Sequence, residues 1–313
     1  MVSGNGAVTP LKILVLGSAA GGGLPQWNCR GANSATARSQ PANVVPRTQS
    51  SLAVSADGCH WALLNASPDL GQQIRSNPQL QPSLSGPLRN SPINAVVLTN
   101  ADVDHIAGLL NLREGHAFDI FATSRIQQVL AANPIFNVLN PAIVRRLPLL
   151  AGQPAPVLPG LTVTAFNVPG KIALYLENEA AGAGLGTEDG DTIGLEVSDG
   201  RSRFFYIPGC ARIDDGLKTR LQGSPLLFLD GTLFTDDEMI AQGLSHKTGQ
   251  RMGHISMSGS GGSLATLADC RIARRVYIHI NNSNPVLRER SPERAEVNRQ
   301  GWDVAFDGME LSL

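Results

Sequence analysis

The amino-acid sequence predicts an α/β protein folded as a four-layer sandwich, in which two β-sheets pack face to face and helices cover their outer sides. Two observations carry this prediction. Each half of the 313-residue chain holds a block of short apolar runs typical of strands, and helical patterns follow each block. No obvious linker separates the two halves, so we expect a single domain over residues 1–313.

The first predicted elements are a buried strand and a glycine-rich turn. The strand covers Lys12–Leu16, and the turn covers Gly17–Gly23. The turn lacks the Lys-Ser/Thr ending of a phosphate-binding loop and the spacing of a dinucleotide-binding fingerprint. We expect it to allow a close approach of chain or substrate, because glycine has no β-carbon. Polar residues without apolar periodicity follow and predict a long loop at about 28–46.

The remaining elements follow from apolar runs and helix-start signals. Further strands are predicted at residues 50–55, 61–65, 95–99, 120–122, 161–167, 192–197, 203–207, 226–230 and 276–280. Helices are predicted after Asp69 and at residues 106–112, 124–132 and 262–273.

Composition and charge exclude several classes of protein. The chain is 42% apolar and 16% charged, which is typical of a globular protein with a sizeable core. A net charge of -1 gives no overall basic field, so we expect neither nucleic acid nor anionic lipid as a partner. Residues 1–10 lack the features of an export signal, and no apolar run approaches the roughly 18 residues of a membrane span. We therefore expect a cytoplasmic protein without membrane insertion.

The cysteines indicate reduced thiols. The chain has only Cys29, Cys59, Cys210 and Cys270, and they lie far apart in the sequence. This spacing fits free thiols better than a disulfide framework, and it offers no site built from cysteine alone.

The segment around Asp104 and His105 is the most informative one. The apolar strand ends at Thr99, and Asp104 and His105 stand at the start of the next helix. Such a position fixes side chains at the rim of a sheet, where α/β proteins commonly build their sites. Carboxylate and imidazole are both ordinary ligands of zinc and iron. The alternative is structural: Asp102 and Asp104 would cap the helix, and His105 would pack locally.

This segment, LTNADVDHIAGLL at residues 98–110, resembles the HxHxDH motif of the metallo-β-lactamase superfamily. Asp104 and His105 match the last two positions of the motif. Asn100 and Asp102 stand where the superfamily has its first two histidines.

Two segments of the second half continue the resemblance. Cys210 occupies the position of the bridging aspartate, and His279 stands where the terminal histidine of the last strand usually binds metal. The resemblance implies a metallo-β-lactamase fold. The replaced ligands make a dinuclear zinc hydrolase the weaker expectation.

Longer segments resemble one family, the pyrroloquinoline quinone (PQQ) biosynthesis protein B family. They are collinear, run almost end to end, and comprise LGSAAGGGLPQWNC (16–29), RTQSS (47–51), NASPD (65–69), LTNADVDHIAGLL (98–110), IPGCARI (207–213), MGHISM (252–257) and HINNSNPVL (279–287). Many members carry further cysteines after the WNC triplet and hold a structural zinc there. In this chain residues 30–34 contain no cysteine, and a lone Cys29 thiolate cannot supply four ligands, so we expect that zinc to be absent.

The retained ligands favour iron chemistry. Asp104, His105 and His279 would supply one carboxylate and two imidazoles, the set that commonly holds non-haem iron(II) and leaves positions open for dioxygen and substrate. Zinc is the alternative metal. Asp102 would add a second carboxylate or orient a ligand, and we count it among the catalytic residues.

The family resemblance implies a role in making PQQ from a cross-linked glutamate and tyrosine, with iron-dependent hydroxylation of the tyrosine ring as the step. The partner is then the small-molecule precursor or PQQ itself, and other proteins of the pathway are further candidates. One alternative is a carrier that helps PQQ or its precursor toward the periplasm. A second alternative is a zinc hydrolase.

Four more residues are candidates for the pocket. Superfamily members place a histidine that contacts substrate or proton traffic near His254, so we predict a catalytic role for it; the alternative is a buried histidine satisfied by backbone. His246 would line the same mouth, unless it is simply exposed to solvent. Arg47 and Arg212 would bind substrate carboxylates in bidentate fashion, with surface salt bridges as the alternative.

Overall fold

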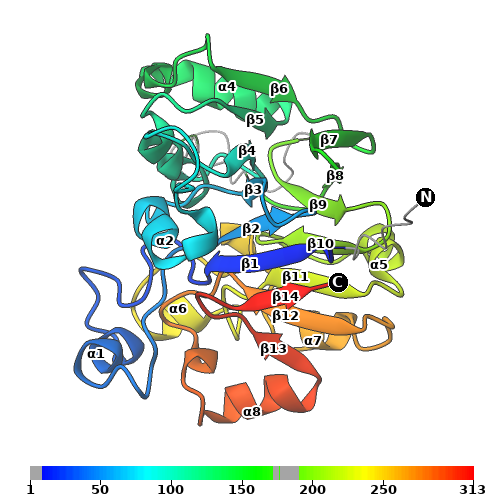
Figure 1. Ribbon diagram of the computed structural model, residues 1–313. Coiled ribbons are helices and arrows are strands. Elements are labelled where there is room, and N and C mark those ends of the chain that lie inside the picture. The colour runs from blue at the N-terminus through cyan, green and yellow to red at the C-terminus, as the bar shows by residue number, and fades with distance from the viewer. Residues whose placement is uncertain (1–8, 172–175, 177–189) are drawn as a thin grey trace.

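The computed structural model describes residues 9–171, 176 and 190–313 (Figure 1). Residues 1–8, which carry most of the prediction that no export signal is present, lie outside this range. None of the described helices is long and apolar enough to cross a membrane.

The described strands form two sheets of seven strands each. In spatial order, sheet one comprises β14 (Glu310–Ser312), β1 (Lys12–Gly17), β2 (Ser51–Ser55), β3 (Trp61–Leu64), β4 (Ile93–Val97), β5 (Phe118–Ala122) and β6 (Val144–Pro148). Sheet two comprises β13 (Trp302–Val304), β12 (Arg274–Ile278), β11 (Leu226–Asp230), β10 (Arg203–Ile207), β9 (Ile193–Ser198), β8 (Leu161–Asn167) and β7 (Pro154–Leu158).

Helices cover the outer sides of both sheets. The described α-helices are α1 (Ala32–Ser39), α2 (Leu70–Ser76), α3 (Val103–Ile106), α4 (Ser124–Ala132), α5 (Asp215–Leu221), α6 (Glu238–Ala241), α7 (Ser263–Thr266) and α8 (Pro292–Arg299). Figure 1 shows α2 and α4 beside sheet one, and α7 and α8 beside sheet two.

Strand β1 shows why four layers form. Its side chains alternate between the two faces of the sheet: Ile13 and Val15 belong to the core between the sheets, whereas Leu14 and Leu16 belong to the core under the helices. Both faces are apolar and buried, so both need cover. The predicted sandwich is confirmed.

The order of the parallel strands positions the site. In sheet one β3, β4, β5 and β6 run parallel, and in sheet two β10, β11, β12 and β13 run parallel. The carboxyl ends of parallel strands share one edge of a sheet, where ligands commonly bind. The segments after β4, β10, β11 and β12 carry the residues considered below.

The predicted long loop at 28–46 is wrong in its middle, where helix α1 forms. The buried Asn33 side chain anchors this helix, because its Nδ2 donates to the carbonyls of Asn282 and Asn284 and its Oδ1 accepts from Arg288. A helix held by polar contacts to a distant segment needs no apolar stripe, so the sequence showed no helical period.

Other boundaries also differ from the predictions. The helix predicted at 262–273 is shorter than expected and comprises only α7. Beyond it, turns rather than a helix bury the apolar side chains of Leu267 and Cys270, and the Cys270 amide donates to the Leu267 carbonyl. The helix predicted at 106–112 begins earlier as α3 and continues as a 3₁₀ helix over Ala107–Leu112. Strands β6, β7, β13 and β14 were not predicted. β13 and β14 have only three residues each, β6 carries two arginines, and β7 carries two prolines that only an edge strand tolerates.

Candidate metal centre

Three of the predicted residues meet beyond the carboxyl ends of β4 and β12, one strand from each sheet. Asp104 and His105 lie in α3 beyond the end of β4, and His279 directly follows β12. One potential ligand atom from each of the three lies within 4.8 Å of the others. His279 Nε2 is 3.0 Å and His105 Nε2 is 4.0 Å from Asp104 Oδ2. Donor atoms that share one ion at about 2.1 Å stand about 3.0–3.4 Å apart, so the three are close to the spacing of a common metal ion.

His105 is oriented by its own loop. Its Nδ1 is 2.7 Å from Asn100 Oδ1, which can only accept, so Nδ1 carries the hydrogen and Nε2 keeps its lone pair. His105 is 1% exposed, and its Nε2 is buried without a hydrogen-bond partner among the described residues. A buried polar atom without a partner is costly, and a metal ion would satisfy it. The residues present therefore fit a metal.

His279 is oriented from a different strand. Its Nδ1 is 2.9 Å from Thr232 Oγ1, and Thr232 in turn donates to Asp230 Oδ1 at 2.7 Å. Because the Asp230 carboxylate accepts the threonine hydrogen, Thr232 Oγ1 can accept from His279 Nδ1–H. The Nε2 of His279 then faces Asp104. In both histidines, Nδ1 therefore donates a hydrogen bond to a protein oxygen and Nε2 points toward the centre, as in most metal-binding histidines.

The backbone of His279 is unusual. Its φ of +58° lies in the left-handed region, where non-glycine residues are uncommon. The surrounding backbone bonds hold it: the next amide, of Ile280, donates to the Ser18 carbonyl, and the Ala20 amide donates to the Ile280 carbonyl. Such backbone strain is typical of functional sites.

The charges of the three side chains are coupled. Burial disfavours the carboxylate of Asp104, but His105 and His279 outweigh it and hold the pKa of Asp104 well below its usual range. Burial lowers the pKa of His105, and the negative charge of Asp104 offsets only part of this lowering. Burial also acts to lower the pKa of His279, but its hydrogen bond to Asp104 outweighs this and raises it. The cluster therefore favours an ionised carboxylate, which is the form that binds metal.

A glycine turn completes this edge of the site. A β-carbon built on Gly21 would lie 3.5 Å from the Asp104 carboxyl carbon, so the turn packs directly against the ligand. Gly22 and Gly23 adopt φ values of +89° and +68°, which glycine accommodates without strain.

His254, predicted as a pocket residue, lies beside the three. Its ring stacks on His279 with 5.2 Å between centroids, and its Nδ1 is 2.8 Å from Asp230 Oδ2. Its side chain is 16% exposed and borders a cavity of about 410 Å³ that Asp236, Ser256 and Ser258 also line. A small molecule in this cavity would contact the imidazole.

Asp230 and Thr232 are the residues that sequence reasoning missed. Asp230 is fully buried and accepts from Thr232, from His254 and from the Cys210 amide. Burial acts to raise its pKa, but the charge and hydrogen bond of His254 outweigh burial and lower it. The available signal was an acidic residue at the end of the apolar run 226–230.

Asp102 does not belong to the three-residue group. Its Oδ1 is 3.8 Å from Lys171 Nζ, and its Oδ2 accepts from Asn100 Nδ2 at 3.2 Å. Cys210 is buried; burial raises the pKa of its thiol, and Sγ donates to the Arg212 carbonyl at 2.9 Å. Of the residues at the replaced superfamily positions, neither Asp102 nor Cys210 occurs in a potential metal-binding group within the described ranges.

Among the described residues, no hydrogen bond or ion pair joins the three residues predicted to bind substrate to Asp104, His105 or His279. Arg47 is only 8% exposed, and its Nη1 donates to the Ala305 carbonyl and to Ser18 Oγ, which favours a structural role. Arg212 and His246 are exposed. Their contact with substrate stays a prediction. Cys29 is a free thiol whose Sγ accepts from the Gly31 amide.

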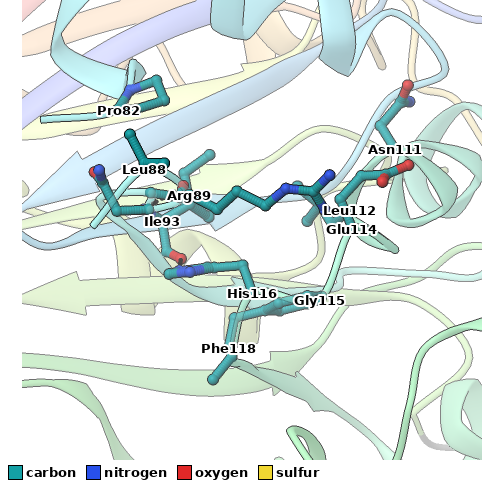
Figure 2. A pocket seen from close by; sticks show the side chains of 13 residues that line it. Pro82, Leu88, Arg89, Ile93, Asn111, Leu112, Glu114, Gly115, His116 and Phe118 are labelled. Atoms are coloured by element: carbon teal, nitrogen blue, oxygen red, sulfur yellow. Dashed lines mark hydrogen bonds between the residues drawn. The ribbon is translucent and has the colours of Figure 1, made fainter. Parts of the chain in front are cut away.

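A second cavity lies apart from these residues. It measures about 510 Å³ and is lined by segments 82–93 and 111–118. Figure 2 shows Arg89 and His116 at this cavity together with Phe118. His116 Nε2 bonds to the Ile93 carbonyl at 3.0 Å, and none of the residues of the metal centre lines the cavity.

Comparison with known proteins places this geometry in context. A family model described as a β-lactamase superfamily domain matches residues 60–280. Coenzyme PQQ synthesis protein B of Methylobacterium radiotolerans is 53% identical over 303 residues, which cover 97% of this chain and 100% of that protein. The protein of the same name from Xanthomonas campestris pv. campestris is 52% identical over the same shares.

Solved structures with the same fold also match this chain. The crystal structure of Zn²⁺-bound PqqB from Methylobacterium extorquens matches with a TM-score of 0.93 and 51% identity, covering 96% of this chain and 100% of that chain. A diphosphatase of the PhnP family matches with a TM-score of 0.66 at 21% identity, over 97% of this chain and 98% of that one, and this match shows a shared fold alone.

Proposed function

The chain belongs to the coenzyme PQQ synthesis protein B family within the β-lactamase superfamily, and from this premise we propose that it acts in PQQ biosynthesis as a metal-dependent enzyme. The observation that carries the metal dependence is the convergence of Asp104, His105 and His279, with the buried Nε2 of His105 left without a partner among the described residues. The relative from Methylobacterium extorquens was crystallised with Zn²⁺, which supports a metal in this fold.

Iron(II) is the metal we propose, held by Asp104, His105 and His279. One carboxylate and two imidazoles on one face are the ligand set of non-haem iron oxygenases. Zinc accepts the same ligands and is the alternative. When bound, iron(II) would supply the redox chemistry that lets dioxygen react with an organic substrate.

The reaction we propose is hydroxylation of a tyrosine-derived ring. One atom of dioxygen enters the ring and the other leaves as water, so each turnover needs two electrons from an external reductant. His254 would accept or return a proton at Nε2, because its Nδ1–H is bound to Asp230. The cavity of about 410 Å³ beside His254 would hold part of the substrate.

The test begins with protein purified without oxygen and loaded with iron(II). We expect about one iron per chain, and oxygen consumption with a tyrosine-derived substrate and ascorbate, with a product that has gained one oxygen atom. Asp104→Ala should abolish both metal retention and turnover. If the wild-type protein neither retains iron nor consumes oxygen, the oxygenase proposal fails.

The alternatives give different results in the same series. A carrier would bind PQQ tightly in a calorimetric titration without turnover, and the binding would survive Asp104→Ala or His105→Ala. A zinc hydrolase would cleave generic esters when loaded with zinc, and the same two substitutions would abolish the cleavage.

A further inference from the structure

Lys171 enters the site from sheet two. It follows β8, and its carbonyl accepts from Thr192 Oγ1 at 3.0 Å, which anchors the backbone. Its stem packs on the residue before His254, since a β-carbon built on Gly253 would lie 2.8 Å from Lys171 Cγ. Its Nζ lies 3.8 Å from Asp102 Oδ1, and the two side chains are only 15% and 22% exposed. The side chain therefore joins the His254 side of the site to the loop that carries Asp104 and His105.

Of the three residues at the replaced superfamily positions, Asn100 and Cys210 carry no negative charge and make hydrogen bonds of their own. Asn100 Oδ1 accepts from His105, and the Cys210 thiol donates to a carbonyl. This leaves the carboxylate of Asp102 as the one negative group at these positions. A second metal ion would neutralise Asp102 if it were present.

An ammonium group can take over that neutralisation. A carboxylate that is mostly out of water needs an opposite charge, and Lys171 is placed to supply it. The same charge repels any divalent cation that approaches Asp102. We propose that the Lys171 ammonium takes the place of a second metal ion and so restricts the centre to one ion. The inference rests on the metal centre proposed above.

Metal stoichiometry tests this directly. Zinc bound per chain would be measured by equilibrium dialysis followed by elemental analysis, for the wild type and for variants that restore ligands. We expect one zinc for the wild type and one for Asp102→His, because Lys171 remains. We expect two for Asp102→His combined with Lys171→His. Asp102→His combined with Lys171→Arg keeps the cation and should stay at one.

Other zinc stoichiometries would overturn either the role of Lys171 or the metal centre itself. A second zinc in Asp102→His alone, or a single zinc in the Asp102→His/Lys171→His variant that retains the wild-type circular dichroism spectrum, overturns the role of Lys171. If that variant fails to fold, Asp102→His/Lys171→Gln replaces it, since glutamine is close to lysine in length and offers an amide oxygen. The same two outcomes then apply. A wild type that binds no zinc instead overturns the metal centre itself.

Discussion

The two histidines of the candidate metal centre reach the same point by different routes. His105 is oriented by Asn100, five residues away on the same loop. His279 is oriented by Thr232, which lies 47 residues away on a neighbouring strand end and itself depends on Asp230. The sheet-one side of the site is therefore built locally, and the sheet-two side is built from segments that only the fold brings together.

This difference has a physical consequence. A local loop can keep its geometry when distant parts of the protein change, whereas a network that spans strands transmits each change to every member. Asp230 orients His254 directly and His279 through Thr232, so one carboxylate controls two imidazoles. Asn100 controls one.

The largest expected effect is the same on both sides, because both histidines are proposed ligands. His105→Ala and His279→Ala should each weaken metal binding by on the order of 10³-fold, which is more than the 10–100-fold loss typical of outer partners. Competition with a chromophoric chelator would measure the affinity. His116→Ala, a histidine at the separate cavity, is the matched control and should leave it unchanged. If only one of the two histidine substitutions weakened metal binding, the two histidines would not share one ion.

A second buried carboxylate on the sheet-two side, that of Glu238, lacks the imidazole partner that Asp230 has. Glu238 of α6 is 5% exposed, accepts from Ser283 Oγ at 2.5 Å and from the Phe234 amide at 2.7 Å, and forms no ion pair among the described residues. Burial raises its pKa from 4.5 to about 7, and these hydrogen bonds offset only part of the effect. Asp230, which has His254 as a partner, shifts the opposite way.

Glu238 should therefore make stability depend on pH. Between pH 4.5 and about 7 the folded protein holds a proton on Glu238 that the unfolded chain has lost, so the free energy of unfolding falls as pH rises. The loss is up to about 3 kcal/mol, and it is complete above about pH 7. Urea denaturation across this range would measure it, with Glu238→Gln as the variant that should remove this part of the slope. An unchanged slope in Glu238→Gln would contradict the assignment.

The contrast between local and distant contacts also explains which residues of the site could be predicted from the sequence. Asp104, His105 and His279 stand at strand ends and a helix start, so their convergence could be expected from the order of the elements. Asp230 and Thr232 could not be assigned a role, because their meaning depends on contacts 24 and 47 residues away. Helix α1 escaped prediction for the same reason, since Asn33 is held by residues about 250 positions later.

The smallest expected effect distinguishes the two sides most directly. Asp230→Asn places an amide NH₂ against donors, so His254 can be driven to the other tautomer and the support of His279 through Thr232 is weakened. Asn100→Ala removes only the acceptor of His105 Nδ1.

We expect Asp230→Asn to lower kcat/KM by roughly 10–100-fold and Asn100→Ala by no more than about tenfold, the lower end of the range for outer partners. The pH profile of kcat should move in Asp230→Asn, because His254 changes its hydrogen bond, and should stay in place in Asn100→Ala, because His254 is untouched. A larger loss in Asn100→Ala, or an unmoved profile in Asp230→Asn, would mean that the loop rather than the strand network governs the site.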